Sequence, residues 1–354
     1  MSDLNFNVIG AYGETNYGDD LLMHVFENYF IKEFPKSKLN FEGERANYPK
    51  KLLKKGTYNK AQNTDWLIFG GGTQFFAFHS QNNLSFIEKV KIGIKNPQIV
   101  INKLKPKRKA SKHIAFLGFG LGPFNDNFNA INNAKKAVSA ANFVAVRDFV
   151  SWEYCREWGI DAVLGADVVF SSYFSLPENS DRNSKKKNKK HGYIVRDWDY
   201  EGTGQAYIKQ LNDYLLTTSN DDKVIILAPL KDKNWIKAIP QEKLLIWDPN
   251  KFTIEQFLEK LDEFDGFISA RYHGAIIAAL LNKPVICIEI EPKLRILADQ
   301  IKEFQLWEKP FVVEKLKKMV DSFDYSIDYS ASLMERKRLA DSMLANFKLE
   351  LYAK

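Results

Sequence analysis

The feature that most constrains the fold is a series of short, continuously apolar runs separated by longer amphipathic stretches. Strands that are buried on both faces read as unbroken apolar runs, as in a parallel sheet covered by helices. Ten runs have this character: NFNVIG, DWLIFG, HIAFLGFG, NFVAVR, DAVLGA, GYIVR, KVIILAPL, KLLIW, GFISA and PVICIEI. Because helical stretches such as TIEQFLEKLDEF separate these runs, the sequence predicts an α/β fold.

A lysine-rich run at residues 182–191 divides this alternating pattern near its middle. Strand–helix units lie on both sides of it, and 354 residues are enough for two domains that each bury a core. We therefore predict two doubly wound, Rossmann-like domains facing a central cleft. The N-terminal domain is expected over 1–178, a basic linker over 179–191 and the C-terminal domain over 192–330. The stretch 331–354 predicts an amphipathic helix that packs back on the N-terminal domain.

The net charge of +7 is concentrated in two tracts. KLKPKRKASK (103–112) and RNSKKKNKKH (182–191) each carry six basic residues and no acid, so the rest of the chain is net acidic. Two interpretations stay open: solvated loops, or a weak contact with anionic lipid head groups. Nucleic acid is not an expected partner, because neither tract interleaves aromatic residues with its charges.

Targeting signals and cysteines indicate the compartment. No apolar run approaches the roughly 20 residues of a membrane span, and MSDLNFNVIG has no basic region followed by an apolar core. Cys155 and Cys287 are too few for a disulfide framework and are predicted to be buried, reduced thiols. We expect a cytoplasmic protein, either free or peripheral at the inner membrane face.

Ligands of open α/β sheets bind at the carboxyl ends of the strands, so polar residues there are the candidates for a site. GAYGETNYGDD follows the first strand, but no Lys-Ser or Lys-Thr pair makes it a Walker loop. Asn16 and Asp19 are interpreted as recognising sugar hydroxyls or as part of a plain turn with an aspartate N-cap. Gly71 and Gly72, in IFGGGTQF, indicate close packing against either a ligand or a neighbouring helix.

Strand ends in the second half carry arginines. Arg196 ends GYIVR, and Arg271 and His273 lie between GFISA and a helix of small residues that starts at Gly274. A helix N-terminus offers free N–H groups and a positive dipole end. These residues together predict an anion site. The alternative is that Arg271 pairs with a nearby carboxylate and His273 caps the helix.

Other strand ends give further candidates. Lys293 opens a helix, where its charge opposes the dipole, so it has either an anionic partner or a surface position. Arg147 either pairs internally or faces the cleft, Asp148 is predicted to cap the following helix, and the role of Asp167 is open. The DWD at 197–199 matches an Asp-x-Asp metal pattern, although a solvated loop is the simpler interpretation.

An ordered set of motifs resembles the polysaccharide pyruvyl transferases: GETNYGDD, FGGG, GFGLGP, VRDFVSWEYCREWG, YIVRDW and SARYHGAIIAALLNKPVICIEIEPK. The resemblance covers about Gly10 to Lys293. It implies a GT-B-like fold, phosphoenolpyruvate as the donor and a sugar hydroxyl pair as the acceptor. The implied product is a cyclic pyruvate ketal on a bacterial surface polysaccharide or its precursor. This chemistry requires neither a metal nor a redox cofactor.

The resemblance also assigns roles. His273 is expected to be the catalytic acid, because a histidine beside a phosphate is held protonated and can deliver a proton to the methylene carbon. Two arginines can grip a carboxylate and a phosphate as planar forks. We therefore expect the substrate, rather than the protein, to be the partner of Arg271 and His273. The residues expected to bind the donor are Arg271, Arg196, Lys293 and Gly274. The residues expected to bind the acceptor are Asn16, Asp19, Gly71 and Gly72.

The sequence departs from the family at two points. The helix after NYG begins Asp-Asp where Asp-Glu is expected, and Tyr272 stands where an aliphatic residue is commoner. Tyr272 could reshape the donor pocket or stack on a sugar, which leaves the acceptor, its linkage and the ketal stereochemistry open. The acceptor could be free or lipid-linked.

Two other functions remain open at this point. A nucleotide-sugar glycosyltransferase of the same fold would bind a diphosphate with the arginines and a ribose with Glu289 or Glu291. A catalytically inactive glycan-binding module is the non-enzymatic alternative.

Overall fold

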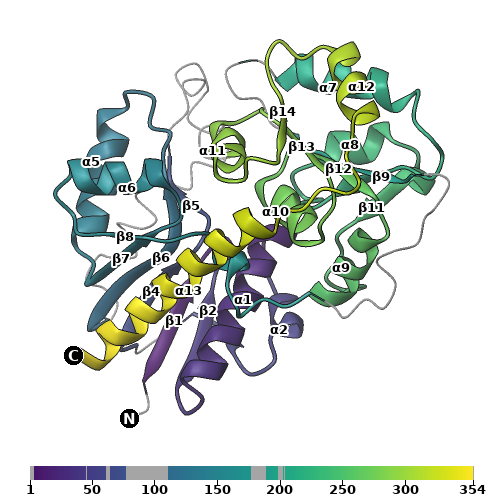
Figure 1. Cartoon of the computed structure of the whole chain (residues 1–354). Helices are drawn as coiled ribbons and strands as arrows, with labels where there is room; N and C mark the ends of the chain where they lie inside the picture. Colours follow the sequence, from purple (N-terminus) through teal and green to yellow (C-terminus); the bar gives the residue numbers. More distant parts are fainter. Residues whose placement is uncertain are drawn as a thin grey trace. The chain divides into compact units, whose positions relative to one another are not determined.

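The computed structural model describes residues 4–44, 46–60, 64–76, 111–176, 189–197, 202 and 204–353. The chain forms two compact units. The first comprises residues 1–13, 19–174 and 335–354, and the second comprises residues 14–18 and 175–334. Each unit is an α/β body built on a parallel sheet (Figure 1), as the unbroken apolar runs predict.

The sheet of the first unit has the strand order β3-β2-β1-β4-β6-β7-β8, with β5 paired to β6. Its strands are β1 (Asn5–Ile9), β2 (Lys38–Glu42), β3 (Thr57–Tyr58), β4 (Trp66–Gly70), β5 (Thr73–Phe75), β6 (His113–Leu121), β7 (Phe143–Val146) and β8 (Val163–Leu164). Its helices are α1 (Tyr17–Glu33), α2 (Pro49–Leu52), α5 (Phe128–Ser139), α6 (Phe149–Glu157) and α13 (Ser330–Ala353), with a short 3₁₀ turn at Val168–Phe170.

The sheet of the second unit has the order β11-β10-β9-β12-β13-β14, and all of its strands are parallel. Its strands are β9 (His191–Ile194), β10 (Lys223–Ile226), β11 (Leu244–Ile246), β12 (Gly266–Ser269), β13 (Val285–Ile288) and β14 (Gln305–Trp307). Its helices are α7 (Gly204–Leu215), α8 (Lys233–Ala238), α9 (Ile254–Asp262), α10 (Tyr272–Leu280), α11 (Pro292–Gln300) and α12 (Val313–Asp321), with a 3₁₀ turn at Gln241–Lys243.

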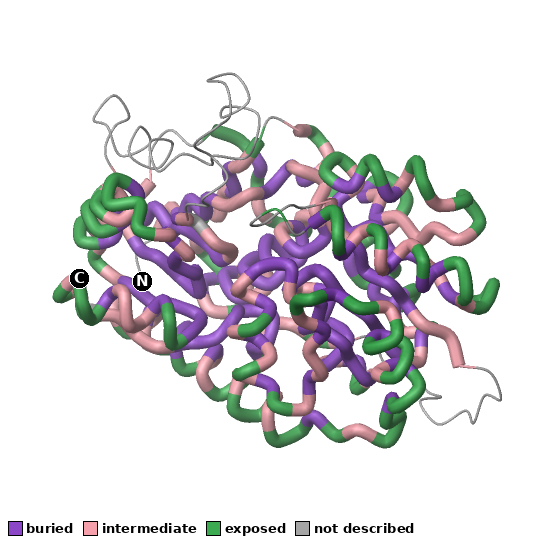
Figure 2. Tube along the Cα trace, turned by 90° about the horizontal axis from the view of Figure 1, so that it is seen from above, coloured by how far each residue is buried: buried purple, intermediate pink, exposed green. Residues whose placement is uncertain are grey.

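Buried positions follow the strands, and exposed positions lie on the outer faces of the helices (Figure 2). Every residue of β4, β12 and β13 is buried. Strands of this kind cannot alternate between polar and apolar residues, since neither face meets water. The unbroken apolar runs of the sequence are the direct result.

The C-terminal helix α13 is part of the core of the first unit. The ring of Phe347 is fully buried, and its centroid lies 5.5 Å from that of Trp66 in β4 and 5.5 Å from that of Phe143 in β7. The hydroxyl of Tyr29 in α1 donates to the main-chain oxygen of Leu344 at 3.0 Å. The helix that ends the chain therefore covers strands that begin it.

Several expectations about the surface and the thiols can be compared with the structure. Cys155 and Cys287 are buried and unpaired, as predicted, and burial raises the pKa of Cys155 to about 12. Most of both basic tracts, at 103–110 and 182–188, lies outside the described residues, as does most of the predicted linker. In the part of the chain that the structure describes, no helix is long and apolar enough to cross a membrane.

We predict that Phe347→Ala destabilises the protein by about 3–5 kcal/mol, because the lost ring leaves a cavity among aromatic neighbours that cannot close it. Chemical denaturation followed by tryptophan fluorescence measures the change. Leu349→Ala on the same helix is the control, since Leu349 is 65% exposed and its loss should cost little. Equal effects of the two substitutions would show that α13 does not complete this core.

Candidate functional site

Sheet register brings the two strand-end arginines together. Strands β9 and β12 are parallel neighbours, and Ile194 pairs with Ser269. Arg196 and Arg271 each lie two residues beyond this pair, at the carboxyl ends of adjacent strands. Nε of Arg271 donates to the main-chain oxygen of Val195 at 3.0 Å, which ties the two ends together. The expectation that both arginines share one end of one sheet is confirmed.

The guanidinium of Arg271 has a partner within the protein. Its Nη2 lies 2.5 Å from both carboxylate oxygens of Asp232, which is wholly buried. Asp232 also accepts a hydrogen bond from the main-chain N–H of Asp197 at 3.0 Å. The expectation that the substrate rather than the protein pairs with Arg271 is therefore wrong, because a buried cation needs a fixed counter-ion. No hydrogen bond joins Nη1 of Arg271 to any residue that the structure describes.

Asp232 is the site residue that the sequence analysis missed. It follows β10, which is the neighbour of β9 on the side away from β12. The signal was present, because KVIILAPLKD places an aspartate just after an apolar run. The rule that selected the arginines, applied to this strand end as well, would have found Asp232.

A second ion cluster joins the buried Glu291 to the partly exposed Arg196 and Lys293. Nη1 of Arg196 and Nζ of Lys293 both contact Oε1 of Glu291, the lysine at 2.9 Å. Burial disfavours ionisation of Glu291, but the charges of Arg196 and Lys293 outweigh it and hold the pKa of this carboxyl below its ordinary value. Burial, with a smaller effect of the charge of Arg271, lowers the pKa of Arg196. The anionic partner expected for Lys293 is thus a residue of the protein.

His273 lies in the first turn of α10, and its ring is held from two sides. The ring of Tyr272, itself buried, meets it edge-on with centroids 5.5 Å apart. Gly18 packs so closely on the imidazole that an added Cβ would lie 2.9 Å from Cγ and closer still to Nδ1. Tyr272 therefore packs against the histidine in this structure.

Close packing explains why residue 274 is a glycine. A Cβ at this position would lie 2.7 Å from Oγ of Ser269 and 2.8 Å from Cδ1 of Ile194. Helix α10 therefore lies closer to β12 and β9 than a side chain would permit. This closeness positions Arg271 and His273 at the edge of the sheet.

Residues 14–18 belong to the second unit, although they come from the start of the chain. The main-chain N–H of Tyr17 donates to the oxygen of Leu227 at 2.9 Å, and its hydroxyl donates to the oxygen of Ile254 at 3.1 Å. Oδ1 of Asn16 accepts from the N–H of Gly18 at 3.3 Å, which makes Asn16 the cap of α1. Of the two interpretations left open for this stretch, the one with an aspartate N-cap is corrected, because Asn16 accepts the capping hydrogen bond.

Arg147 forms an ion pair within the first unit. Internal pairing, one of the two alternatives that the sequence left open for this residue, is therefore observed. Its Nη1 lies 3.3 Å from Oδ2 of Asp167 and its Nη2 donates to Oγ1 of Thr73 at 3.0 Å. Asp148 caps α6 by accepting from the N–H of Ser151 at 2.8 Å, as predicted. These residues organise the strand ends of the first sheet.

The remaining acceptor-side candidates also lie in the first unit. Gly71 has φ +69°, and an added Cβ would lie 2.9 Å from Leu22 of α1, so a neighbouring helix explains this glycine. Gly72 has φ +70°. Asp19 lies in the first turn of α1, and its charge adds to the effect of burial, which raises the pKa of Tyr12.

Glu289 does not join the cluster around Glu291. Both of its carboxylate oxygens accept hydrogen bonds from Arg295 at 2.6 Å, on an exposed face of α11. Residues 198 and 199 of the predicted Asp-x-Asp pattern lie outside the described residues. Among the residues that are described, no group of three or more His, Cys, Asp or Glu side chains is placed to hold a metal ion.

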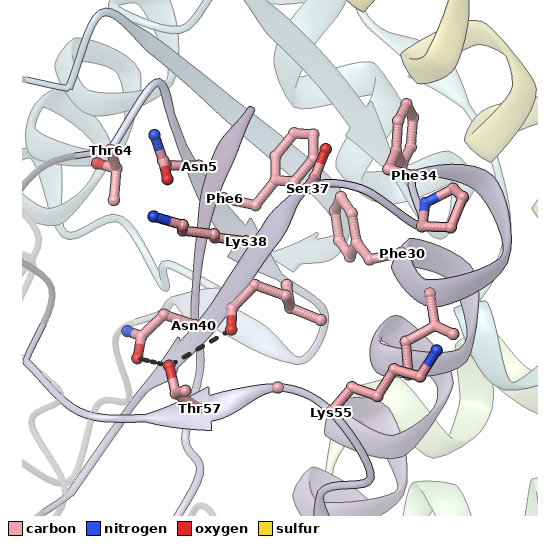
Figure 3. A pocket seen from close by; sticks show the side chains of 14 residues that line it. Asn5, Phe6, Phe30, Phe34, Ser37, Lys38, Asn40, Lys55, Thr57 and Thr64 are labelled. Carbon is pink, nitrogen blue, oxygen red and sulfur yellow. Dashed lines mark hydrogen bonds between the residues drawn. The ribbon is translucent and has the colours of Figure 1, made fainter. Parts of the chain in front are cut away.

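A separate pocket of about 440 Å³ lies at the opposite, amino-terminal end of the first sheet (Figure 3). Phe30 of α1 and Phe34, just after the end of that helix, form an apolar wall, and Asn40 and Thr57 face it from the strands. Two of the polar groups there are bonded to each other, since Oγ1 of Thr57 donates to Oδ1 of Asn40 at 2.8 Å. None of the predicted site residues lines this pocket.

Comparison with known proteins gives a family and a fold. The family model described as polysaccharide pyruvyl transferase matches residues 16–292. None of the curated proteins compared with the chain matches it.

Solved structures with a similar fold have low sequence identity. S. aureus MnaA, solved with UDP, has a TM-score of 0.58 at 10% identity, covering 97% of this chain and 94% of its own. A UDP-N-acetylglucosamine 2-epimerase from Rickettsia bellii has a TM-score of 0.56 at 10% identity, covering 99% and 96%. Anabaena Alr3699/HepE, in complex with UDP-glucose, has a TM-score of 0.52 at 12% identity, covering 97% and 95%. These likenesses confirm the predicted class of two Rossmann-like domains of the GT-B type.

We predict that Gly18→Ala displaces the imidazole of His273, because the new methyl group would overlap the ring. Overpacking of this kind should lower the free energy of unfolding by about 1–3 kcal/mol. Proton–carbon NMR of the five histidines should show a shift of the His273 ring signals.

Gly159→Ala is the control for this experiment. Its φ is +70°, but an added Cβ would meet no atom within 4 Å. It should cost stability through backbone strain and leave the His273 signals in place. Unchanged His273 signals in Gly18→Ala would show that the glycine does not set the position of the ring.

Proposed function

Because the chain belongs to the polysaccharide pyruvyl transferase family, we propose that it transfers the pyruvyl group of phosphoenolpyruvate to a pair of sugar hydroxyls. The product would be a cyclic ketal on a surface polysaccharide or its precursor. The observation that carries this proposal is the pair of arginines placed side by side by the register of β9 and β12. Phosphoenolpyruvate presents two anionic groups on one small frame, which two neighbouring guanidinium groups can grip.

The ion pairs of the arginines are compatible with this role. Asp232 holds one edge of the Arg271 guanidinium, and a second edge, at Nη1, faces no acceptor among the described residues. A guanidinium fixed along one edge presents the other in a set direction, and preorganisation of this kind strengthens binding. Asp232 thus supports a clamp on the donor without occupying all of its N–H groups.

His273 would supply the proton for the reaction. In the first step a C–H bond forms between this proton and the methylene carbon of the donor, and the adjacent carbon becomes electron-poor. A sugar hydroxyl adds to that carbon and loses its proton. The second hydroxyl then forms a C–O bond to the same carbon and loses its proton, while the bond to phosphate breaks and the phosphate leaves with that proton. Positioned proton transfer of this kind contributes about 10²–10⁴-fold in rate.

The site explains less well a glycosyltransferase that uses Glu289 or Glu291 to hold a ribose. Arg295 occupies both oxygens of Glu289, and Arg196 and Lys293 converge on Glu291. The structural neighbours solved with UDP or UDP-glucose share the fold at 10–12% identity. Thermal shift with phosphoenolpyruvate and with a panel of nucleotide sugars separates the two functions.

We place the reaction in the cytoplasm. The acceptor would be a sugar, free or lipid-linked, on the same side of the membrane as the donor. The two basic tracts at 103–112 and 182–191 would favour the inner membrane face through anionic head groups. Asn16, Asp19, Gly71 and Gly72 remain the proposed acceptor side.

We predict that Arg271→Lys loses at least about 10²-fold in kcat/KM for phosphoenolpyruvate, since an ammonium cannot keep the grip on Asp232 and still present a planar edge. Phosphate release with a galactoside, glucoside or N-acetylmannosamine-type acceptor measures the rate. Circular dichroism checks that the variant is folded. Turnover close to that of the wild type, with unchanged donor affinity, would contradict the clamp.

We predict that His273→Gln lowers kcat by about 10²–10⁴-fold while the donor dissociation constant changes little. Glutamine keeps a polar shape but is no acid near neutral pH, and both arginines still hold the donor. A variant that keeps the wild-type kcat would remove the histidine from the mechanism. Weaker donor binding with an unchanged kcat would instead indicate that His273 only holds a phosphate.

A further inference from the structure

Glu291 holds two cations with one oxygen. Arg196 and Lys293 both contact Oε1. The side chain of Glu291 is only 5% exposed, whereas that of Lys293 is 29% exposed and that of Arg196 16%. A single anionic oxygen therefore lies between two cations that solvent can still reach. A carboxylate or phosphate oxygen of a ligand would require the same contacts.

The position of Glu291 on its helix suggests that it can release these cations. It is the N-cap residue of α11, with extended backbone angles (φ −146°, ψ 151°), but its side chain makes no capping hydrogen bond. The carboxylate reaches toward Arg196 and Lys293 instead of the first turn. A negative charge at a helix N-terminus is stabilised by the helix dipole. A carboxylate that lost its two cations would thus remain in a favourable place.

The charges of the cluster give a reason for such an exchange. Arg196, Lys293 and Arg271 face the carboxylates of Glu291 and Asp232, and Asp232 is held on Arg271 by two short contacts. Moving Glu291 away would release Arg196 and Lys293 from this carboxylate, so that an anionic group of the donor could bind them in its place.

We propose that Glu291 is an internal counter-ion that the anionic group of the donor displaces from Arg196 and Lys293. Glu291 therefore sets the affinity of the site for anions and weakens it. The identity of the donor rests on the proposed function, but the exchange itself concerns any anion of this kind. A purely structural glutamate, which only holds Arg196 in place, would have the opposite effect on affinity.

The test compares inorganic phosphate binding to the wild-type chain and to Glu291→Gln by isothermal titration calorimetry. Glutamine keeps the size of the side chain but removes the competing charge. We expect phosphate to bind about tenfold more tightly to the variant, which corresponds to about 1.4 kcal/mol. The rise in melting temperature caused by phosphate should also be larger, because the ligand supplies the missing counter-ion.

Glu308→Gln is the matched control. Glu308 also bridges an arginine and a lysine, with Arg295 at 2.6 Å and Lys315 at 3.5 Å, but on an exposed face. Its substitution should leave phosphate binding unchanged. A gain in affinity equal to that of Glu291→Gln would show a general effect of net charge.

Glu291→Asp carries the test if Glu291→Gln does not fold. Aspartate is one methylene shorter, so it withdraws from the two cations, and it is a favoured N-cap that supports α11. It keeps the charge of the site and should still bind phosphate more tightly than the wild type does. The proposal is overturned if the folded variants bind phosphate as weakly as, or more weakly than, the wild-type chain.

Phosphoenolpyruvate separates this proposal from the proposed function. Tighter binding of both phosphate and phosphoenolpyruvate to Glu291→Gln supports the exchange and the donor together. Tighter binding of phosphate alone supports the exchange and contradicts phosphoenolpyruvate as the donor. Loss of affinity for both ligands contradicts the exchange and leaves the donor clamp to be judged by the Arg271→Lys experiment.

Discussion

The candidate site depends on burying two guanidinium groups at one edge of a sheet. The register of β9 and β12 places Arg196 and Arg271 at equivalent positions, two residues beyond a paired Ile194 and Ser269. Like charges so close together repel one another, and both lose water on burial. A separate carboxylate, from a strand end two positions away in the sheet, offsets each cost. Asp232 after β10 pairs with Arg271 across β9, and Glu291 after β13 pairs with Arg196 across β12.

The two pairs differ in a way that matters for function. Asp232 is wholly buried and contacts Arg271 with both oxygens, whereas Glu291 shares one oxygen between two partly exposed cations. Breaking a buried pair without a replacement costs several kcal/mol. The pair of Asp232 and Arg271 is therefore suited to fixing the orientation of the Arg271 guanidinium. The contacts of Glu291 with Arg196 and Lys293 are suited to exchange, in which another anion replaces the carboxylate. One edge of the sheet thus combines a rigid ion pair with an exchangeable one.

The sequence predicts most of this architecture, and its failures have physical causes. All ten apolar runs became strands, because burial on both faces leaves an unmistakable pattern. The strands that were missed, β2, β3, β5 and β14, are short, and β2 and β14 include polar or half-exposed residues that such a pattern cannot mark. Arg196, Arg271 and Lys293 were found from their places at strand ends and helix starts. Asp232 also follows an apolar run, so the same rule reaches it. What no local pattern encodes is the pairing of Asp232 with Arg271 and of Glu291 with Arg196, because these pairings depend on the spatial order of the strands.

The discontinuous division of the chain has a consequence for its synthesis. The second unit includes Tyr17, whose ring packs against Trp247 and Phe257 with centroids 4.9 Å from each. The first unit includes residues 335–354, whose Phe347 fills its core. Domains usually fold in order as they leave the ribosome. In this chain the core of the first unit is completed only when residues 335–354 have been synthesised. A chain cut between the two halves would therefore leave each unit without a segment that packs in its core.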